Sequence, residues 1–104
     1  MSTSRPRCRF PACPRPAQAD RRGRLLYCSY VHYRVCEMAR AVAQSQAPPR
    51  GRDLARDAEE ALRLVNVAAD VGPGERLSRE DYRSLNELTD AYRHRSGPRG
   101  PRPR

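Results

Sequence analysis

Lysine is absent from this 104-residue chain, phenylalanine occurs once, and no long apolar run is present. Because a membrane-spanning helix needs about 18 or more consecutive apolar residues, no transmembrane segment and no membrane partner are expected. A hydrophobic fraction of 38% supports only a small core. A core of that size benefits from an added staple such as a metal ion. The length fits one domain at most.

An apolar leader is lacking as well. The first residues, MSTSRPRCRFPACPRP, carry positive charge with no apolar segment behind them. This start predicts a protein without a signal peptide, placed in the cytoplasm. In a reducing cytosol, four cysteines indicate metal ligands or redox thiols rather than structural disulfides.

The positive charge comes from arginine alone, with 21 arginines in the chain. The arginine guanidinium forms paired hydrogen bonds with phosphate and guanine and stacks on bases. An excess of arginine therefore favours binding to nucleic acid. Residues 1–52 hold 11 arginines against two acids, which leaves +9, and residues 93–104 hold five arginines and no acid. Residues 53–92 hold five arginines against ten acids, which leaves −5. Two basic ends therefore flank an acidic middle, an asymmetry that points to binding partners.

Composition divides the chain into five segments. We expect a disordered basic arm over 1–7, a zinc-binding module with a helix over 8–46, and a Pro-rich linker over 47–52. An αα-hairpin is predicted over 53–95, and a disordered basic tail over 96–104.

Apolar spacing predicts the helices. After a loop or short hairpin over 11–24 and a short strand over 25–27, a helix is expected over about 30–46. Asp53 is a candidate N-cap for a helix over 54–71, and Ser78 for a third helix. The apolar stripe of the second helix is predicted to be Leu54, Ala58, Ala61, Leu62, Val65, Ala68 and Ala69, broadened by Leu64 and Val71.

The predicted fold class is small and mainly α. A zinc-stapled N-terminal module opens a helix, and an antiparallel αα-hairpin follows it. The apolar faces of the hairpin helices need a cover. Either the first helix or a second copy of the protein would supply that cover.

Four cysteines and one histidine lie at the spacing Cys8-x4-Cys13-x14-Cys28-x3-His32-x3-Cys36. Structural zinc sites take four sulfur or nitrogen ligands in two short-range pairs separated by a longer loop. Cys8 with Cys13 and Cys28 with His32 fit that arrangement. The spacing therefore predicts a Zn²⁺ ion held by these four residues.

Cys36 leaves an alternative open. It lies one turn beyond His32, so the two share a helix face. Cys36 is either the alternate fourth ligand in place of His32 or a small apolar side chain in the core.

The stretch from Cys8 to Ala41 resembles a zinc-finger segment of small actinobacterial and actinophage proteins. The resemblance lies in C-x4-C-x-R-P, a Gly-Arg spacer, and YCS-x2-[CH], seen here from Cys8 to Pro16, at 23–24 and from Tyr27 to His32. It covers about residues 8–40. It implies a treble-clef-like or ribbon-like Cys3His zinc site, an association with DNA, and a bacterial or nucleoid-associated location.

A weaker resemblance concerns His32-x3-Cys36. It matches half of the H-x3-C-x2-C motif of zinc-associated anti-sigma factors, but the last cysteine position of that motif is Ala39 here. The resemblance implies a redox-responsive regulator that acts on a protein partner through the acidic helical hairpin.

No enzymatic activity is expected, because the segment 8–36 holds one acid, Asp20, and no other candidate general base beside the metal ligands. The leading hypothesis is a transcription-associated accessory factor that binds nucleic acid, DNA more than RNA, with arginines at the zinc end and in the tails. The candidate contacts are Arg5, Arg7, Arg9, Arg15, Arg21, Arg22, Arg24, Arg34, Arg40, Arg99, Arg102 and Arg104.

The alternative hypothesis is a protein-interaction module. In this view residues 53–95 mediate homodimer formation or bind a basic protein partner. The two hypotheses are compatible, with nucleic acid at the basic ends and protein at the acidic middle.

Overall fold

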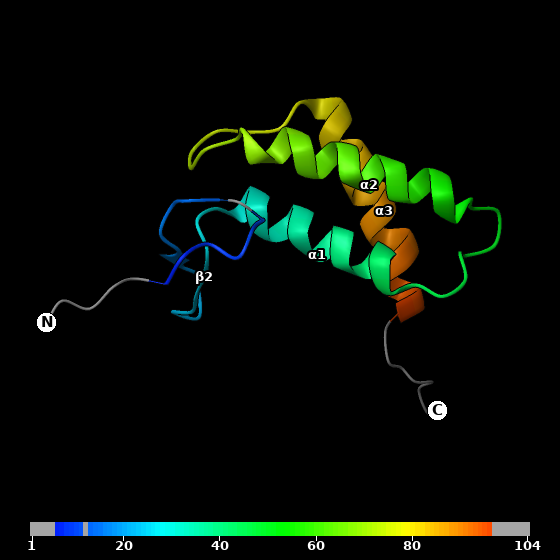
Figure 1. Cartoon of the computed structure of the whole chain (residues 1–104), viewed down its shortest axis with the longest axis horizontal. Helices are drawn as coiled ribbons and strands as arrows, with labels where there is room; N and C mark the ends of the chain where they lie inside the picture. Colours follow the sequence, from blue (N-terminus) through cyan, green and yellow to red (C-terminus); the bar gives the residue numbers. More distant parts are fainter. Residues whose placement is uncertain (1–5, 12, 97–104) are drawn as a thin grey trace, which may run out of the picture.

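The computed structural model describes residues 6–11 and 13–96, with side chains up to Tyr92. It contains two short strands and three helices: β1 (Gln18–Ala19), β2 (Leu25–Tyr27), α1 (Tyr30–Gln44), α2 (Leu54–Ala69) and α3 (Arg79–Ser96). The small, mostly helical class is confirmed (Figure 1). Ser96, the first residue of the predicted tail, ends α3 instead, and the rest of the tail and most of the predicted arm lie outside the described residues. Within them, no helix is long and apolar enough to cross a bilayer.

The strands form an antiparallel hairpin closed by Asp20. The Asp20 carboxylate accepts the backbone N–H groups of Arg22 and Arg24 at 2.8 and 2.9 Å. Gly23 completes the turn with a φ of 79°, a backbone conformation that glycine adopts without steric cost. The arginine-rich segment 21–24 is therefore the tip of an ordered turn.

The segment before the hairpin is fixed to it by backbone hydrogen bonds. The N–H of Cys8 donates to the carbonyl of Arg15 at 3.0 Å, and the N–H of Arg9 donates to the carbonyl of Leu26 at 2.8 Å. The loop that carries Cys8 and Cys13 is thus held beside β2, which leads directly to Cys28.

Helix α1 begins immediately after the hairpin because Ser29 caps it. Ser29 has an extended backbone, and its hydroxyl accepts the N–H of His32 at 3.3 Å. One face of α1 is buried, formed by Val31, His32, Val35, Met38 and Val42. His32 thus lies on the same face of α1 as its buried apolar side chains.

Helices α2 and α3 begin at the predicted caps. The Asp53 carboxylate accepts the N–H of Arg56, and the Ser78 hydroxyl accepts the N–H of Asp81 at 3.1 Å. The predicted stripe of α2 needs correction, because Leu62 is exposed and the inward face holds Asp57, Ala61, Leu64 and Ala68. Apolar residues lie on both sides of α2, so periodicity alone placed the face wrongly by part of a turn.

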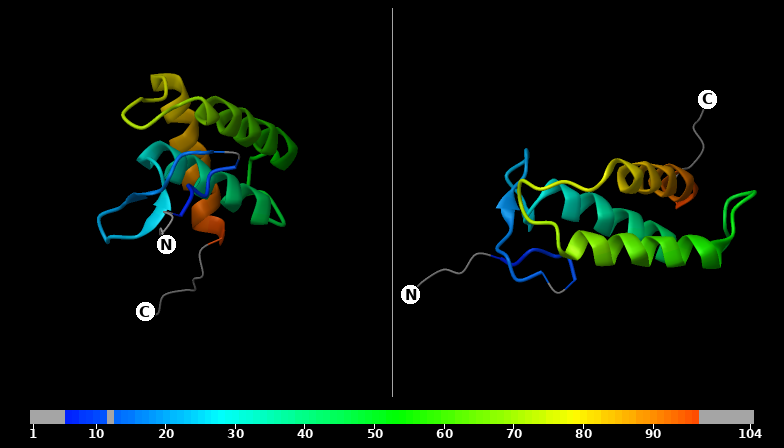
Figure 2. Two further views of the ribbon diagram at one scale, coloured as in Figure 1. Left: turned by 60° about the vertical axis from the view of Figure 1, so that its left-hand side comes forward. Right: turned by 90° about the horizontal axis from the view of Figure 1, so that it is seen from above.

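Helix α1 packs against both α2 and α3, and it is the cover that their apolar faces required. Figure 1 shows α1 and α2 running side by side in opposite directions, with α3 crossing behind them, and Figure 2 agrees. This arrangement changes the hairpin prediction, in which α2 and α3 pair mainly with each other. Helices α2 and α3 contact each other less than each contacts α1, because the buried face of α1 offers both of them an apolar surface. Buried residues from the cysteine module and all three helices form one hydrophobic core.

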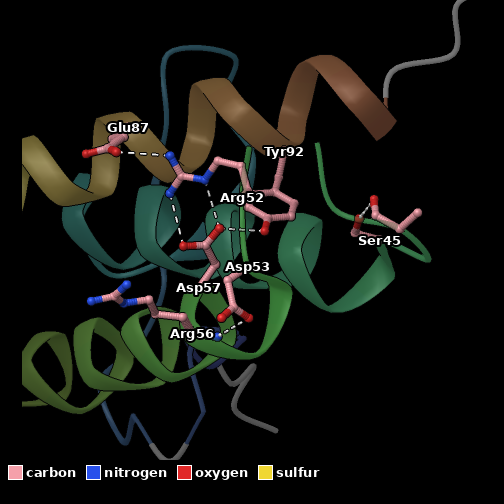
Figure 3. A network of polar contacts seen from close by, with 8 residues as sticks. Ser45, Arg52, Asp53, Arg56, Asp57, Glu87 and Tyr92 are labelled. Atoms are coloured by element: carbon pink, nitrogen blue, oxygen red, sulfur yellow. Dashed lines mark hydrogen bonds and ion pairs between the residues drawn. The ribbon is translucent and has the colours of Figure 1, made fainter. Parts of the chain in front are cut away.

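A polar network ties the linker to α2 and α3 (Figure 3). Arg52 donates to both carboxylate oxygens of Asp57 at 2.8 and 3.0 Å and to Glu87 at 3.0 Å. The hydroxyl of Tyr92 donates to Asp57 at 2.6 Å. Asp57 is buried, so these partners are what allow a carboxylate on the inward face of α2.

Candidate metal centre

Cys8, Cys13, Cys28 and His32 converge at one point where the module meets the helices. One ligand atom from each residue lies within 4.8 Å of all the others, and all four residues are buried. Cys8 and Cys13 come from the loop before β1, Cys28 follows β2, and His32 lies in the first turn of α1. The structure therefore brings together the four residues that the spacing predicted.

The distances between the ligand atoms suit a tetrahedral ion. Zinc–sulfur bonds of about 2.3 Å and zinc–nitrogen bonds of about 2.0 Å place two sulfur atoms about 3.8 Å apart and a sulfur and a nitrogen about 3.5 Å apart. The Sγ atoms of Cys13 and Cys28 are 3.8 Å apart. The Nδ1 of His32 lies 3.3 Å from Cys28 Sγ and 3.6 Å from Cys8 Sγ. These separations exceed a disulfide bond of about 2.05 Å and leave room for a metal ion between the atoms.

The second nitrogen of the His32 ring is held by helix α2. The carbonyl of Ala68 can only accept, so Nε2 carries the proton and donates to it at 2.7 Å. This leaves the lone pair of Nδ1 facing the three cysteines. Histidine ligands in metal sites are usually fixed by such a hydrogen bond from the other nitrogen.

Phe10 fixes the plane of the same ring. Its ring stacks on His32 with centroids 4.0 Å apart and an interplanar angle of 17°. Phe10 is buried, and its backbone N–H points to the Cys8 sulfur at 3.4 Å. Phe10 thus orients the His32 imidazole through its ring and stabilises negative charge on the Cys8 sulfur through its backbone N–H. The side chain of Arg15 lies 4.0 Å from the Cys13 sulfur and adds positive charge beside the group.

The candidate ligands differ in how their surroundings shift their pKa values. Burial lowers the pKa of His32, so its ring is neutral. Burial alone would raise the pKa of Cys13, but hydrogen bonds from the Arg15 backbone and from Cys28 lower it below its usual value. Burial and the neighbouring thiols raise the pKa of Cys28 to about 11. A divalent cation would relieve this repulsion, because metal ligands bind as thiolates and release their protons.

Cys36 lies outside this group of four. It is half-buried, and burial together with the neighbouring Cys36 thiol raises the pKa of Tyr27. The alternate ligand assignment is therefore not supported by the geometry. The anti-sigma-like pairing of His32 with Cys36 is not formed either, because His32 points to the cysteines upstream.

The candidate arginines are mostly exposed. Those that the structure describes are Arg7, Arg9, Arg15, Arg21, Arg22, Arg24, Arg34 and Arg40, of which Arg15 and Arg34 are half-buried. Arg24 pairs with Asp20 at 2.9 Å, and Arg40 approaches Glu37 at 3.8 Å. The other four candidates, Arg5, Arg99, Arg102 and Arg104, lie outside the described residues.

Three supporting residues were not found from the sequence. Ser29 had a detectable signal, since serine directly before a helical pattern is a typical N-cap. Phe10 had a weaker one, as the single phenylalanine lies two residues after a ligand. Ala68 acts through its backbone carbonyl, which no sequence pattern identifies.

Comparison with protein-family models, curated proteins and solved structures finds no match for this chain. The two family resemblances therefore remain predictions, and the metal-ligand geometry stands on its own.

Proposed function

We propose that this chain is a small zinc-binding protein whose arginine-rich module binds nucleic acid, DNA in preference to RNA, as a transcription-associated accessory factor. The observation that carries the zinc assignment is the convergence of the ligand atoms of Cys8, Cys13, Cys28 and His32 within 4.8 Å of one another, with separations of 3.8 Å for Cys13–Cys28 and 3.3 Å for Cys28–His32. Three thiols and one imidazole form a donor set that structural zinc uses. Protein atoms fill all four positions, which leaves none for a substrate and gives the metal a structural role.

The charge around this site supports the nucleic-acid part of the proposal. The segment 6–29 contains six arginines and a single acid, Asp20. Three thiolates on Zn²⁺ leave a net charge of −1, so the module stays strongly basic. Among the described residues, Arg7, Arg9, Arg21 and Arg22 form no ion pair. Guanidinium groups that no carboxylate neutralises are suited to contact phosphates.

Two arginines beyond the metal module, one in the linker and one in α2, contrast with these. Arg52 pairs with Asp57 and Glu87, and Arg63 pairs with Glu60 and Asp81. The positive charge of these two arginines is offset by acids of the acidic middle, so it is not free to contact phosphates. Phosphate contacts are therefore assigned to the metal module.

The salt dependence of DNA binding tests this assignment. The affinity of the zinc-loaded protein for duplex DNA should fall linearly on a log–log plot of affinity against salt. Replacing Arg21 and Arg22 together with alanine should lower the slope by up to about 2. The matched control replaces Arg79 and Arg83, two exposed arginines of α3, and changes the net charge equally.

Equal losses in the two double variants would mean that only net charge matters, which would overturn the assignment to the module. An absence of binding to DNA and RNA at low salt would refute the nucleic-acid function itself. Neither result bears on zinc, which is measured separately.

A second candidate function is protein interaction through the acidic middle. A hollow of about 560 Å³ lies between the linker, α2 and α3. Its lining includes Asp53, Glu59, Glu60 and Glu87. Acids at such a surface favour a basic protein partner or a second copy. Sedimentation of the protein across a concentration range tests homodimer formation. Retention of the zinc-loaded chain by basic peptides, lost in a Glu59→Gln and Glu87→Gln double variant, tests a basic partner.

A further inference from the structure

Arg15 differs from the other arginines before α1 in the direction of its side chain. Its Nη1 donates toward the Cys13 sulfur, with the two atoms 4.0 Å apart. Arg15 is half-buried, whereas the other described arginines before α1 are exposed, namely Arg7, Arg9, Arg21, Arg22 and Arg24. The Arg15 guanidinium therefore lies against the ligand group, while the side chains of the other five face solvent.

The backbone on either side of Arg15 is restrained. Pro14 and Pro16 flank it, and a proline restricts both its own φ and the conformation of the residue before it. The Arg15 carbonyl accepts the N–H of Cys8 at 3.0 Å. The point from which the Arg15 side chain leaves the backbone is thus fixed by the loop that carries two of the candidate ligands.

Gly72, in the connection between α2 and α3, lies against the same guanidinium. Figures 1 and 2 show this connection, in yellow, beside the metal module. Gly72 is buried, and a Cβ atom added to it would lie 3.3 Å from Nη2 and 3.6 Å from Cζ of Arg15. Non-bonded atoms pack best at about 3.5–4.0 Å, so a side chain at position 72 would push the guanidinium away. The φ of Gly72 is not positive, so space rather than backbone conformation requires a glycine here.

The connection is closed by two hydrogen bonds between Gly72 and Glu75. The N–H of Gly72 donates to Oε1 of Glu75 at 2.6 Å, and the N–H of Glu75 donates to the carbonyl of Gly72 at 3.0 Å. Oε1 of Glu75 lies 3.4 Å from the position of the same added Cβ. The turn is thus held in shape where it meets the Arg15 guanidinium, and it places a carboxylate nearby.

A loaded metal site at this place needs a counter-charge. Three thiolates and one neutral imidazole on Zn²⁺ carry a net charge of −1, and all four ligand residues are buried. A buried charge is costly unless an opposite charge or hydrogen bonds compensate it. Groups that hydrogen-bond to metal ligands also fix the positions of those ligands. The Arg15 guanidinium is placed to do both for the Cys13 sulfur.

We propose that Arg15 is the counter-charge and a positioning residue of the metal centre, and that Gly72 leaves the space in which its guanidinium lies. Through these two residues the connection between α2 and α3 supports the metal site without providing a ligand. Arg15, a candidate phosphate contact by sequence, is thereby assigned to the metal. This inference rests on the proposed zinc binding and extends it to residues outside the ligand set.

The zinc affinity of the full chain, measured by competition with a zinc indicator, tests the inference. Arg15→Met keeps the length of the side chain but removes its charge, and should weaken zinc binding by at least about tenfold, as loss of a group that supports a ligand does. Arg15→Lys keeps the charge and should bind zinc more tightly than Arg15→Met. The matched control is Arg76→Met, which removes an exposed arginine from the same connection and should change the affinity by less than about twofold.

Gly72→Ala tests the space beside the guanidinium. It should weaken zinc binding less than Arg15→Met does, because it displaces the charge without removing it. In the Arg15→Met background Gly72→Ala should cause no further loss, because its effect is transmitted through Arg15. A purely structural effect of Gly72→Ala would be the same in both backgrounds.

The counter-charge role would be overturned by a zinc affinity that is unchanged in Arg15→Met, reduced equally in Arg15→Met and Arg76→Met, or no tighter in Arg15→Lys than in Arg15→Met. No loss from Gly72→Ala, or equal losses in the two backgrounds, would overturn the role of Gly72. Zinc binding by the unmodified protein stands in each of these cases. An unmodified protein that binds no zinc would overturn both the inference and the zinc assignment.

Discussion

The ring of His32 joins the metal-ligand group to helix α2, because its Nε2 donates to the Ala68 carbonyl at 2.7 Å. The two residues are 36 positions apart in the chain. Through this contact the proposed zinc ion holds the helical packing as well as the cysteine loops.

Removal of the metal should therefore destabilise the helices. We expect a chelator to lower the helix melting temperature by at least about 10 °C, since metal binding is coupled to folding and each lost kcal/mol shifts a domain of this size by about 4–8 °C. Circular dichroism during heating measures this. A Cys28→Ser variant, which lacks a ligand, should show no further response to the chelator. Superimposable melting curves with and without chelator would contradict the coupling.

Cys36 should behave differently from the other cysteines. In the zinc-loaded protein, an alkylating reagent should modify Cys36 first, because the half-buried Cys36 lies outside the group formed by Cys8, Cys13 and Cys28. Mass spectrometry should find one modified cysteine before chelation and four after it. Cys36→Ser should keep its metal. Rapid modification of a predicted ligand in the loaded protein would count against the assignment.

Asp57 should contribute to stability in a pH-dependent way. Hydrogen bonds from Arg52 and Tyr92, set against the cost of burial, hold the pKa of Asp57 below its usual value. The contribution is thus present above the unfolded-state pKa of about 3.9 and is lost as the pH falls through the lower folded-state pKa. Asp57→Ala should lower the free energy of unfolding at neutral pH by about 3 kcal/mol, as breaking a buried pair does.

Glu87→Ala is the control for Asp57, because Glu87 pairs with the same Arg52 but its side chain is 62% exposed. Glu87→Ala should lower the free energy of unfolding by less than about 1 kcal/mol. Urea unfolding at neutral pH and near pH 3 compares the two variants. If Asp57→Ala and Glu87→Ala lowered the free energy of unfolding equally at neutral pH, burial of the Arg52–Asp57 pair would be irrelevant to its contribution.

The cap of α1 should matter for the metal as well as for the helix. Ser29→Ala removes the acceptor for the His32 N–H and should cost about 1 kcal/mol in the free energy of unfolding. Since Ser29 lies between Cys28 and His32, zinc affinity should fall with it. Ser45→Ala, at the other end of α1, is the control and should leave zinc affinity unchanged. A competition titration with a zinc indicator measures both.

Much of this structure could be predicted from residues with strong local signals. Cys8, Cys13, Cys28 and His32 have ligand chemistry and paired spacing, and Asp53 and Ser78 are typical caps. The inward face of α2 could not be predicted, because Leu62 and Leu64 lie on different sides of the helix with equal hydropathy. The buried Asp57 was also missed, since its partners Arg52 and Tyr92 come from other parts of the chain.

The helix arrangement depends on long-range packing. The short connection between α2 and α3 predicts that these two helices pack against each other. Both helices nevertheless pack more extensively on α1. The contact of His32 with the Ala68 carbonyl is of the same kind, as backbone atoms carry no sequence signal. These features follow from how apolar faces combine, which local patterns do not determine.

The zinc content of the purified chain and of its single ligand variants tests the central claim most directly. Native mass spectrometry of the unmodified protein should show one zinc ion per chain. Serine in place of Cys8, Cys13 or Cys28 should abolish or strongly weaken binding, and Cys36→Ser should retain the ion. A chain purified without zinc that does not take it up, or a Cys28→Ser variant that holds zinc as tightly as the unmodified protein, would contradict the account.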